Sequence, residues 1–85
     1  MTAETRAALF DFLDNHPGVQ VWVEPATGFN KASILLVAGD GEWLRRNAAE
    51  PSARDFAKQA KLTCFTAGLD AYPQRMRDWD LREKD

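Results

Sequence analysis

The stretch SILLVAGDG, residues 33–41, decides the fold of this chain. It holds four consecutive large aliphatic residues, Ile34 to Val37, and neighbouring residues of a strand point to opposite faces of a sheet. Both faces of this strand must therefore be covered, so we expect it to lie at the centre of a sheet. The triplet Gly39-Asp40-Gly41 then ends the strand, because glycine accepts the positive φ angles that a tight hairpin requires.

Two flanking segments are predicted to pair with this central strand as antiparallel neighbours. Residues 19–24, with the sequence VQVWVE, alternate with a period of two, which is typical of a half-buried strand. The three valines of this segment face the core, whereas Trp22 shares the opposite face with two polar residues. Residues 25–32 form the loop to the central strand, and residues 42–47 return from the glycine turn as a third strand.

The remaining segments predict three helices and a short strand. The first helix follows Thr2 as its N-cap and ends near Asn15, shortly before a proline. The second begins after Ser52, which opens a capping-box pattern, and it presents a face of small apolar residues. The third begins near Asp70 with a proline in its first turn. Residues 62–66 are β-prone, which favours a short strand at an edge of the sheet.

These elements predict one α+β domain over residues 1–85. Their order is α-β-β-β-α-(β)-α, and we expect a three- to four-stranded antiparallel sheet with helices packed mainly on one face. Residues 80–85 are almost wholly charged and are expected to fray.

The charge of the chain is small overall and unevenly distributed. The net charge of −2 argues against strong nonspecific binding to nucleic acid or to an anionic membrane. Residues 1–44 carry two lysines or arginines against six acidic residues, whereas residues 45–77 carry seven against three. The N-terminus lacks the apolar core of a signal peptide, and no run approaches the ~20 apolar residues that span a bilayer. We therefore expect a soluble cytoplasmic protein with no membrane partner.

The residue types that support catalysis or metal binding are scarce. His16 and Cys64 are each unique, so a nucleophilic Cys–His pair is possible by count alone. However, His16 stands at a predicted helix end, where an imidazole serves as a cap, and Cys64 stands in a predicted strand as a packing residue. Zinc sites need several Cys or His ligands at fixed spacings. We expect a protein that is not an enzyme and that has no catalytic residues, metal or cofactor.

The aromatic content favours a protein-interaction module. Three tryptophans, five phenylalanines and one tyrosine are many for a small core. Trp22 in particular falls on the polar face of its strand, so either a helix or a partner must cover it. Trp22 is therefore a candidate protein-contact residue, and the partner would be another protein or a second copy of this chain.

The alternative hypothesis is that the protein binds nucleic acid or another anionic ligand. Residues 43–46 and 72–79 combine basic and aromatic side chains, the mixture that contacts phosphates and stacked bases. The order of elements also resembles that of double-stranded RNA-binding domains, although the second helix here lacks their lysine-rich start. The candidate anion contacts are Arg45, Arg46, Tyr72, Arg75 and Arg77.

Two segments resemble parts of a known group of sequences. The segment AGDGEW, residues 38–43, and the segment GLDAYPQRMRDW, residues 68–79, resemble those of small uncharacterised bacterial proteins that pair a GDGEW turn with a late YPQRM helix. The resemblance implies a shared fold and no activity that can be named. It also implies that the two segments lie together, which would place Arg45 or Arg46 near Arg75 or Arg77.

Overall fold

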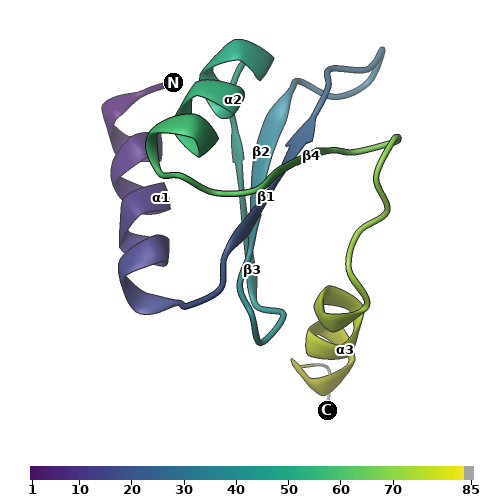
Figure 1. Cartoon of the computed structure of the whole chain (residues 1–85). Helices are drawn as coiled ribbons and strands as arrows, with labels where there is room; N and C mark the ends of the chain where they lie inside the picture. Colours follow the sequence, from purple (N-terminus) through teal and green to yellow (C-terminus); the bar gives the residue numbers. More distant parts are fainter. Residues whose placement is uncertain (84–85) are drawn as a thin grey trace.

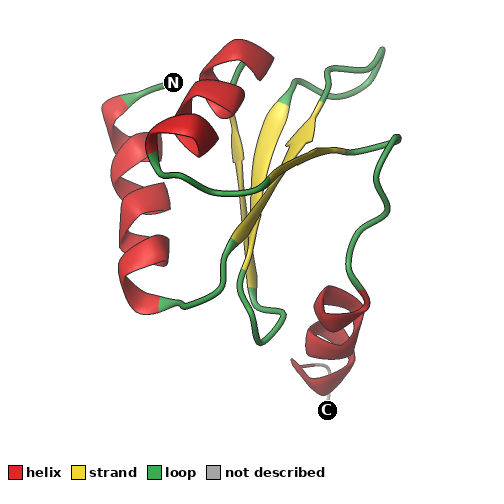
Figure 2. Ribbon diagram, viewed as in Figure 1, coloured by secondary structure: helices red, strands yellow, loops and turns green. Residues whose placement is uncertain are grey.

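The computed structural model describes residues 1–83 as a four-stranded sheet with helices on both faces (Figures 1 and 2). The helices and strands, in chain order, are α1 (Ala3–Asn15), β1 (Gln20–Glu24), β2 (Ser33–Val37), β3 (Trp43–Asn47), α2 (Glu50–Gln59), β4 (Cys64–Thr66) and α3 (Gln74–Glu83). The strands lie side by side in the order β3-β2-β1-β4. Helices α1 and α2 cover one face of the sheet, and α3 lies at the other (Figure 1).

The central position of β2 is confirmed. All five of its residues are buried, and it pairs antiparallel with β1 on one side and with β3 on the other. Ile34 and Leu36 point to the face covered by α1 and α2, and Leu35 and Val37 point to the face covered by α3. The run of four aliphatic residues is therefore explained by burial on both faces.

The prediction of a purely antiparallel sheet is wrong, because β4 pairs parallel with β1. Two hairpins leave β3 running in the same direction as β1. Helix α2 then crosses the face of the sheet and returns the chain to the far side of β1, where β4 enters in that same direction. A helical crossover is the usual connection between parallel strands, so the sheet is mixed.

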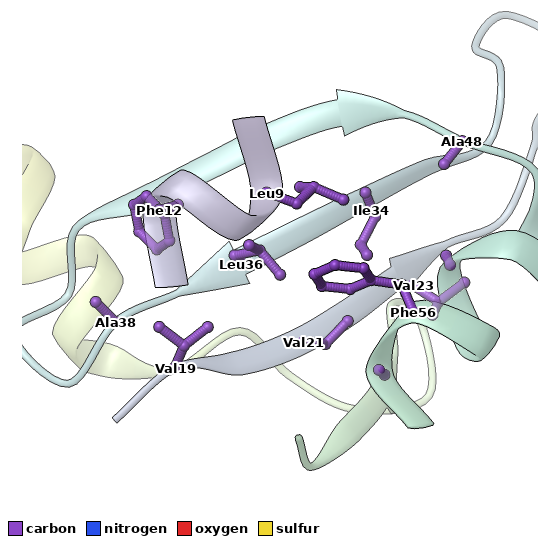
Figure 3. Packing of buried hydrophobic residues seen from close by; sticks show 12 residues of the cluster. Leu9, Phe12, Val19, Val21, Val23, Ile34, Leu36, Ala38, Ala48 and Phe56 are labelled. Atoms are coloured by element: carbon purple, nitrogen blue, oxygen red, sulfur yellow. The ribbon is translucent and has the colours of Figure 1, made fainter. Parts of the chain in front are cut away.

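The main core lies between the sheet and the pair α1 and α2 (Figure 3). Leu9 and Phe12 from α1 and Phe56 from α2 pack over the valines of β1 and the aliphatic residues of β2. Ala53 and Ala57 are fully buried, and their small side chains let α2 lie close to the sheet. The apolar face predicted for α2 is therefore confirmed.

A second, smaller core lies on the opposite face, between the sheet and α3. Trp22, Leu35 and Val37 of the sheet pack against Met76 of α3, with Trp43, Phe65 and Tyr72 at the margin. Polar contacts then hold α3 against the turn between β2 and β3. Arg75 Nε donates to the Ala38 carbonyl at 2.9 Å, and Trp43 Nε1 donates to Asp80 Oδ1 at 2.7 Å.

Gly41 allows the closest approach between this turn and α3. Its φ is +96°, and a Cβ at this position would lie 2.0 Å from the carbonyl oxygen of Arg75. Only glycine fits such a contact. The segments 38–43 and 68–79 therefore meet through Gly41, Trp43 and the first turns of α3.

Several predicted boundaries move in the structure. Thr2 caps α1 by accepting from the Thr5 amide at 3.1 Å, as expected. Helix α2 starts at Glu50 with Ala49 as its N-cap, not at Ser52, because Pro51 is tolerated in a first turn. Helix α3 starts at Gln74 rather than near Asp70. Residues 80–83, expected to fray, belong to α3, and residues 84–85 lie outside the described residues.

Candidate binding cleft

A cleft opens at one end of the sheet, on the face that α3 leaves partly uncovered. Because β1 and β4 run parallel, the 25–32 loop and the 67–73 segment leave the sheet at the same end (Figure 1). The cleft between them has a volume of about 690 Å³ and is lined by both segments and by residues of β2 and β3. We call it the loop-end cleft.

The polar floor of the loop-end cleft is organised around the Glu24 carboxylate. Its Oε1 accepts from Ser33 Oγ at 2.6 Å and from Arg45 Nε at 2.7 Å. Its Oε2 accepts from Arg45 Nη2 at 2.9 Å and from the Tyr72 hydroxyl. The register explains the cluster, because Ser33 is paired with Glu24 across β1 and β2 and Arg45 lies on the same face of β3.

These contacts fix the charges in the floor. Burial alone would raise the pKa of Glu24, but the hydrogen bonds from Arg45, Ser33 and Tyr72 outweigh it and lower the pKa below its ordinary value. Burial and the hydrogen bond to Glu24 raise the pKa of Tyr72. The hydrogen bond to Glu24 likewise raises the pKa of Arg45. At neutral pH the floor is therefore a carboxylate, a guanidinium and a neutral phenol.

Two large apolar side chains stand in water at the loop-end cleft, one in its lining and one next to a lining residue. Phe29 is 98% exposed at the tip of the 25–32 loop, and Leu69, which follows a lining glycine, is 84% exposed. The Phe29 amide donates to Thr27 Oγ1 at 3.2 Å, and the Leu69 amide donates to the Thr66 carbonyl at 3.1 Å. Both apolar side chains therefore stand on hydrogen-bonded turns.

A shallower hollow of about 620 Å³ continues the loop-end cleft around the end of the sheet. The two share Lys31 and Asn47, and the hollow then runs past Ala48 and Ala49 towards Met1. Together they form a groove that passes over the ends of several strands. A continuous groove of this kind suits an extended chain segment.

The structure separates the five predicted anion contacts. Arg45 and Tyr72 come together at Glu24. Arg75 lies at the other end of β1, where its Nη2 donates to Gln20 Oε1 at 2.5 Å.

The two remaining arginines stand apart from this pair. Arg46 is paired with Ile34 and so lies on the opposite face of the sheet from Arg45. Arg77 is exposed on α3. The suggested proximity of Arg45 or Arg46 to Arg75 or Arg77 is therefore not found among the described contacts.

Trp22, the candidate protein-contact residue, is buried instead. It is 2% exposed and stacks on Phe65 with ring centroids 4.6 Å apart, while Tyr72 lies 6.3 Å away. The face of Trp22 is therefore covered by other parts of the same chain and not by a partner. Its indole N–H has no hydrogen-bond partner among residues 1–83.

The free edge of β3 is partly blocked against pairing with a second copy. The hydrogen bonds from Ala38 N to Glu42 O and from Ala48 N to Ala32 O show which alternate residues of β3 are hydrogen-bonded to β2. Arg45 is not one of them, so its backbone N–H and C=O point away from β2. The Arg46 side chain then donates to the outward Arg45 carbonyl at 2.8 Å. A two-fold antiparallel pairing centred on Arg45 or on Arg46 would also set like charges face to face, which is unfavourable.

The unique histidine and cysteine have different partners. His16 Nδ1 lies 2.8 Å from the Phe12 carbonyl, and its Nε2 contacts the Glu42 carboxylate. Cys64 is exposed, and its thiol lies 3.8 Å from the Phe65 carbonyl. Within residues 1–83, no group of three or more His, Cys, Asp or Glu is placed to hold a metal ion. In the same part of the chain, no helix has the length and apolar character to cross a bilayer.

Of the residues that build the loop-end cleft, the sequence pointed to Arg45 and Tyr72 and not to Glu24, Ser33 or Phe29. Glu24 and Arg45 could have been linked once the strand register was known, since both lie on the face of Trp22. Phe29 and Leu69 carry only a weak signal, that of an apolar residue within a turn segment. No family model, no curated protein and no solved structure matches the chain.

Proposed function

We propose that this protein is a binding module that holds an extended segment of another protein in the loop-end cleft. The observation that carries the proposal is the exposure of Phe29, at 98% in the lining of the cleft, and of Leu69, at 84% directly after the lining residue Gly68. Large apolar side chains held in water beside a cleft are typical of protein-contact surfaces. A partner that covers both would remove them from water at once.

The floor of the loop-end cleft favours binding over catalysis. A general base needs a lone pair that faces the substrate. The Glu24 carboxylate already accepts four hydrogen bonds, which is about as many as its two oxygens take. Its lowered pKa and the raised pKa of Tyr72 also move both groups away from neutral pH, where acid–base catalysts work best.

A different protein is favoured over a second copy of this chain. The exposed edge of β3 is the simplest surface for self-association, but the Arg46 side chain covers the Arg45 carbonyl there. Nucleic-acid binding is the weaker candidate, because Arg46 and Arg75 lie away from Arg45 and do not extend a basic surface across the cleft.

Selection from a displayed library of random linear peptides tests the proposal. We expect peptides with apolar residues to be enriched on the native protein and lost on a Phe29→Ser, Leu69→Ser double variant. Both side chains are exposed, so the double variant should keep the native unfolding midpoint.

Leu81→Ser is the matched control, because Leu81 is a 64% exposed leucine on α3 and neither it nor its sequence neighbours line the cleft. Enriched peptides should bind this control as they bind the native protein. Equal binding to the double variant, or no enrichment, would contradict the proposal.

A further inference from the structure

We infer that the segment held in the loop-end cleft is acidic, with carboxylate side chains set among apolar residues. This inference rests on the proposed function and adds the chemistry of the partner. It follows from three properties of the cleft: its unmatched positive charge, the direction in which its hydroxyl groups donate, and the two exposed apolar side chains at its opening.

The first property is the charge. Glu24, Lys31 and Arg45 are the charged residues that line the cleft. Glu24 and Arg45 neutralise each other through two hydrogen bonds, at 2.7 and 2.9 Å. Lys31 forms no ion pair within residues 1–83, so the cleft carries one uncompensated positive charge. The neighbouring Asp70 is already engaged, since its Oδ2 accepts from the Thr66 amide at 2.9 Å.

Arg45 adds donors that remain available. Its Nε and Nη2 bind Glu24, whereas its Nη1 makes no hydrogen bond within the described part of the chain. The Arg45 side chain is 42% exposed and lies over the Trp43 ring at 5.2 Å, which holds the guanidinium plane in place. A carboxylate that reaches the cleft can therefore accept from Lys31 and from the free edge of Arg45.

The second property is the polarity of the two hydroxyl groups. Ser33 and Tyr72 each donate their single hydroxyl hydrogen to Glu24. Towards the cleft they can only accept a hydrogen bond. A partner that offers N–H donors as well as a carboxylate can therefore use both kinds of group in the cleft. The backbone of a peptide supplies such donors at every residue except proline, whereas phosphate groups supply none.

The third property is the pair of exposed apolar side chains at the cleft. Phe29 lines the cleft from the 25–32 loop, and Leu69 follows the lining residue Gly68 in the 67–73 segment. In an extended segment, successive side chains point in opposite directions. Apolar side chains that alternate with acidic ones can therefore contact Phe29 and Leu69 while the carboxylates face the floor.

Three labelled peptides of about eight residues, each spanning roughly 26 Å when extended, test the inference by fluorescence polarisation. The first alternates Phe or Leu with Asp or Glu. The second replaces Asp and Glu by Asn and Gln, and the third replaces them by Lys. We expect the acidic peptide to bind about five- to tenfold more tightly than its amide counterpart at low salt, with the lysine peptide weakest.

Substitution of Lys31 separates this inference from the proposed function. Lys31→Gln should remove most of the preference for the acidic peptide and leave the affinity for the amide peptide unchanged, and Lys31→Arg should restore the preference. Lys58→Gln, an exposed lysine of α2 outside the cleft, should change neither affinity.

Each other outcome has a distinct meaning. Equal binding of the acidic and amide peptides overturns the acidic partner while the proposed function stands. Binding of none of the three overturns both. Tighter binding of a single-stranded oligonucleotide than of any peptide overturns the peptide and identifies a nucleic-acid surface.

Discussion

The two faces of the sheet are built differently. The face under α1 and α2 is a continuous apolar layer, in which Phe56 and Leu9 fill the space above the aliphatic residues of the strands. The face under α3 is apolar over half of its length and polar over the rest, and it leaves the Trp22 indole N–H without a partner among residues 1–83. An unpaired buried donor costs roughly 1–3 kcal/mol. The first face therefore stabilises the fold, and the second combines packing at the turn end with a cleft at the loop end.

The largest expected effect comes from breaking the first face. Phe56 is 1% exposed, so Phe56→Ala should lower the free energy of unfolding by about 3–5 kcal/mol. A chain of this length has a total stability of about 4–13 kcal/mol, so the variant should be close to unfolding. Urea denaturation followed by tryptophan fluorescence measures the change. A loss below about 1 kcal/mol would contradict the assignment of the main core to this face.

Gly41→Ala should weaken the packing of α3 on the second face and leave the packing of the first face intact. The added Cβ would meet the Arg75 carbonyl, and its φ of +96° is unfavourable for alanine, so we expect a loss of about 1–3 kcal/mol. Amide hydrogen exchange should accelerate in α3 and stay slow in α1 and α2. Gly28→Ala is the control, because nothing lies within 4 Å of its added Cβ. Uniform acceleration over all three helices would show that the two faces unfold together.

The contrast between these faces shows what the sequence could reveal. The burial of β2 follows from its run of consecutive aliphatic residues, and the buried face of β1 follows from its two-residue alternation. Both patterns are local in the sequence. The direction of β4 cannot be predicted from its three residues, because they do not indicate whether the helix before them crosses the sheet. The Glu24 cluster also needed the register of three strands, since Glu24, Ser33 and Arg45 lie far apart in the sequence. Local periodicity therefore located the main core, whereas the second core under α3 and the cleft beside it depend on the topology.

Glu24→Gln tests the polar half of the second face. The variant removes the negative charge that Arg45 faces and places an amide N–H₂ group against donors that need an acceptor. We therefore expect the free energy of unfolding to fall by about 1–3 kcal/mol. Because the pKa of Glu24 is lowered on folding, its contribution is present above the unfolded pKa and is lost as the pH falls through the folded value, below about 4.5. The variant should show less acid destabilisation in that window. Glu50→Gln, at an exposed pair with Arg54, should change stability by less than about 0.5 kcal/mol.

The smallest expected effect on stability is that of His16, which contacts Glu42 after the turn between β2 and β3. This turn also contacts α3. Burial alone would lower the pKa of His16, but the hydrogen bonds to the Phe12 carbonyl and to Glu42 outweigh it and raise the pKa above 6.5. Its contribution is therefore complete below the unfolded pKa and is lost as the pH rises through the folded value. His16→Gln should flatten the pH dependence of unfolding just above pH 6.5. An unchanged slope would contradict the contact with Glu42, since this is the sole histidine of the chain.

The most direct test of the loop-end cleft is a titration of the ¹⁵N-labelled protein with the acidic peptide, followed by amide chemical shifts. The amides of residues 24–33 and 66–72 should move with a single saturation curve, together with that of Arg45. The amides of α1 and α2 should stay in place. Shifts that gather on α1 and α2, or along the outer edge of β3 alone, would show that the partner binds elsewhere and that the cleft is not the binding site.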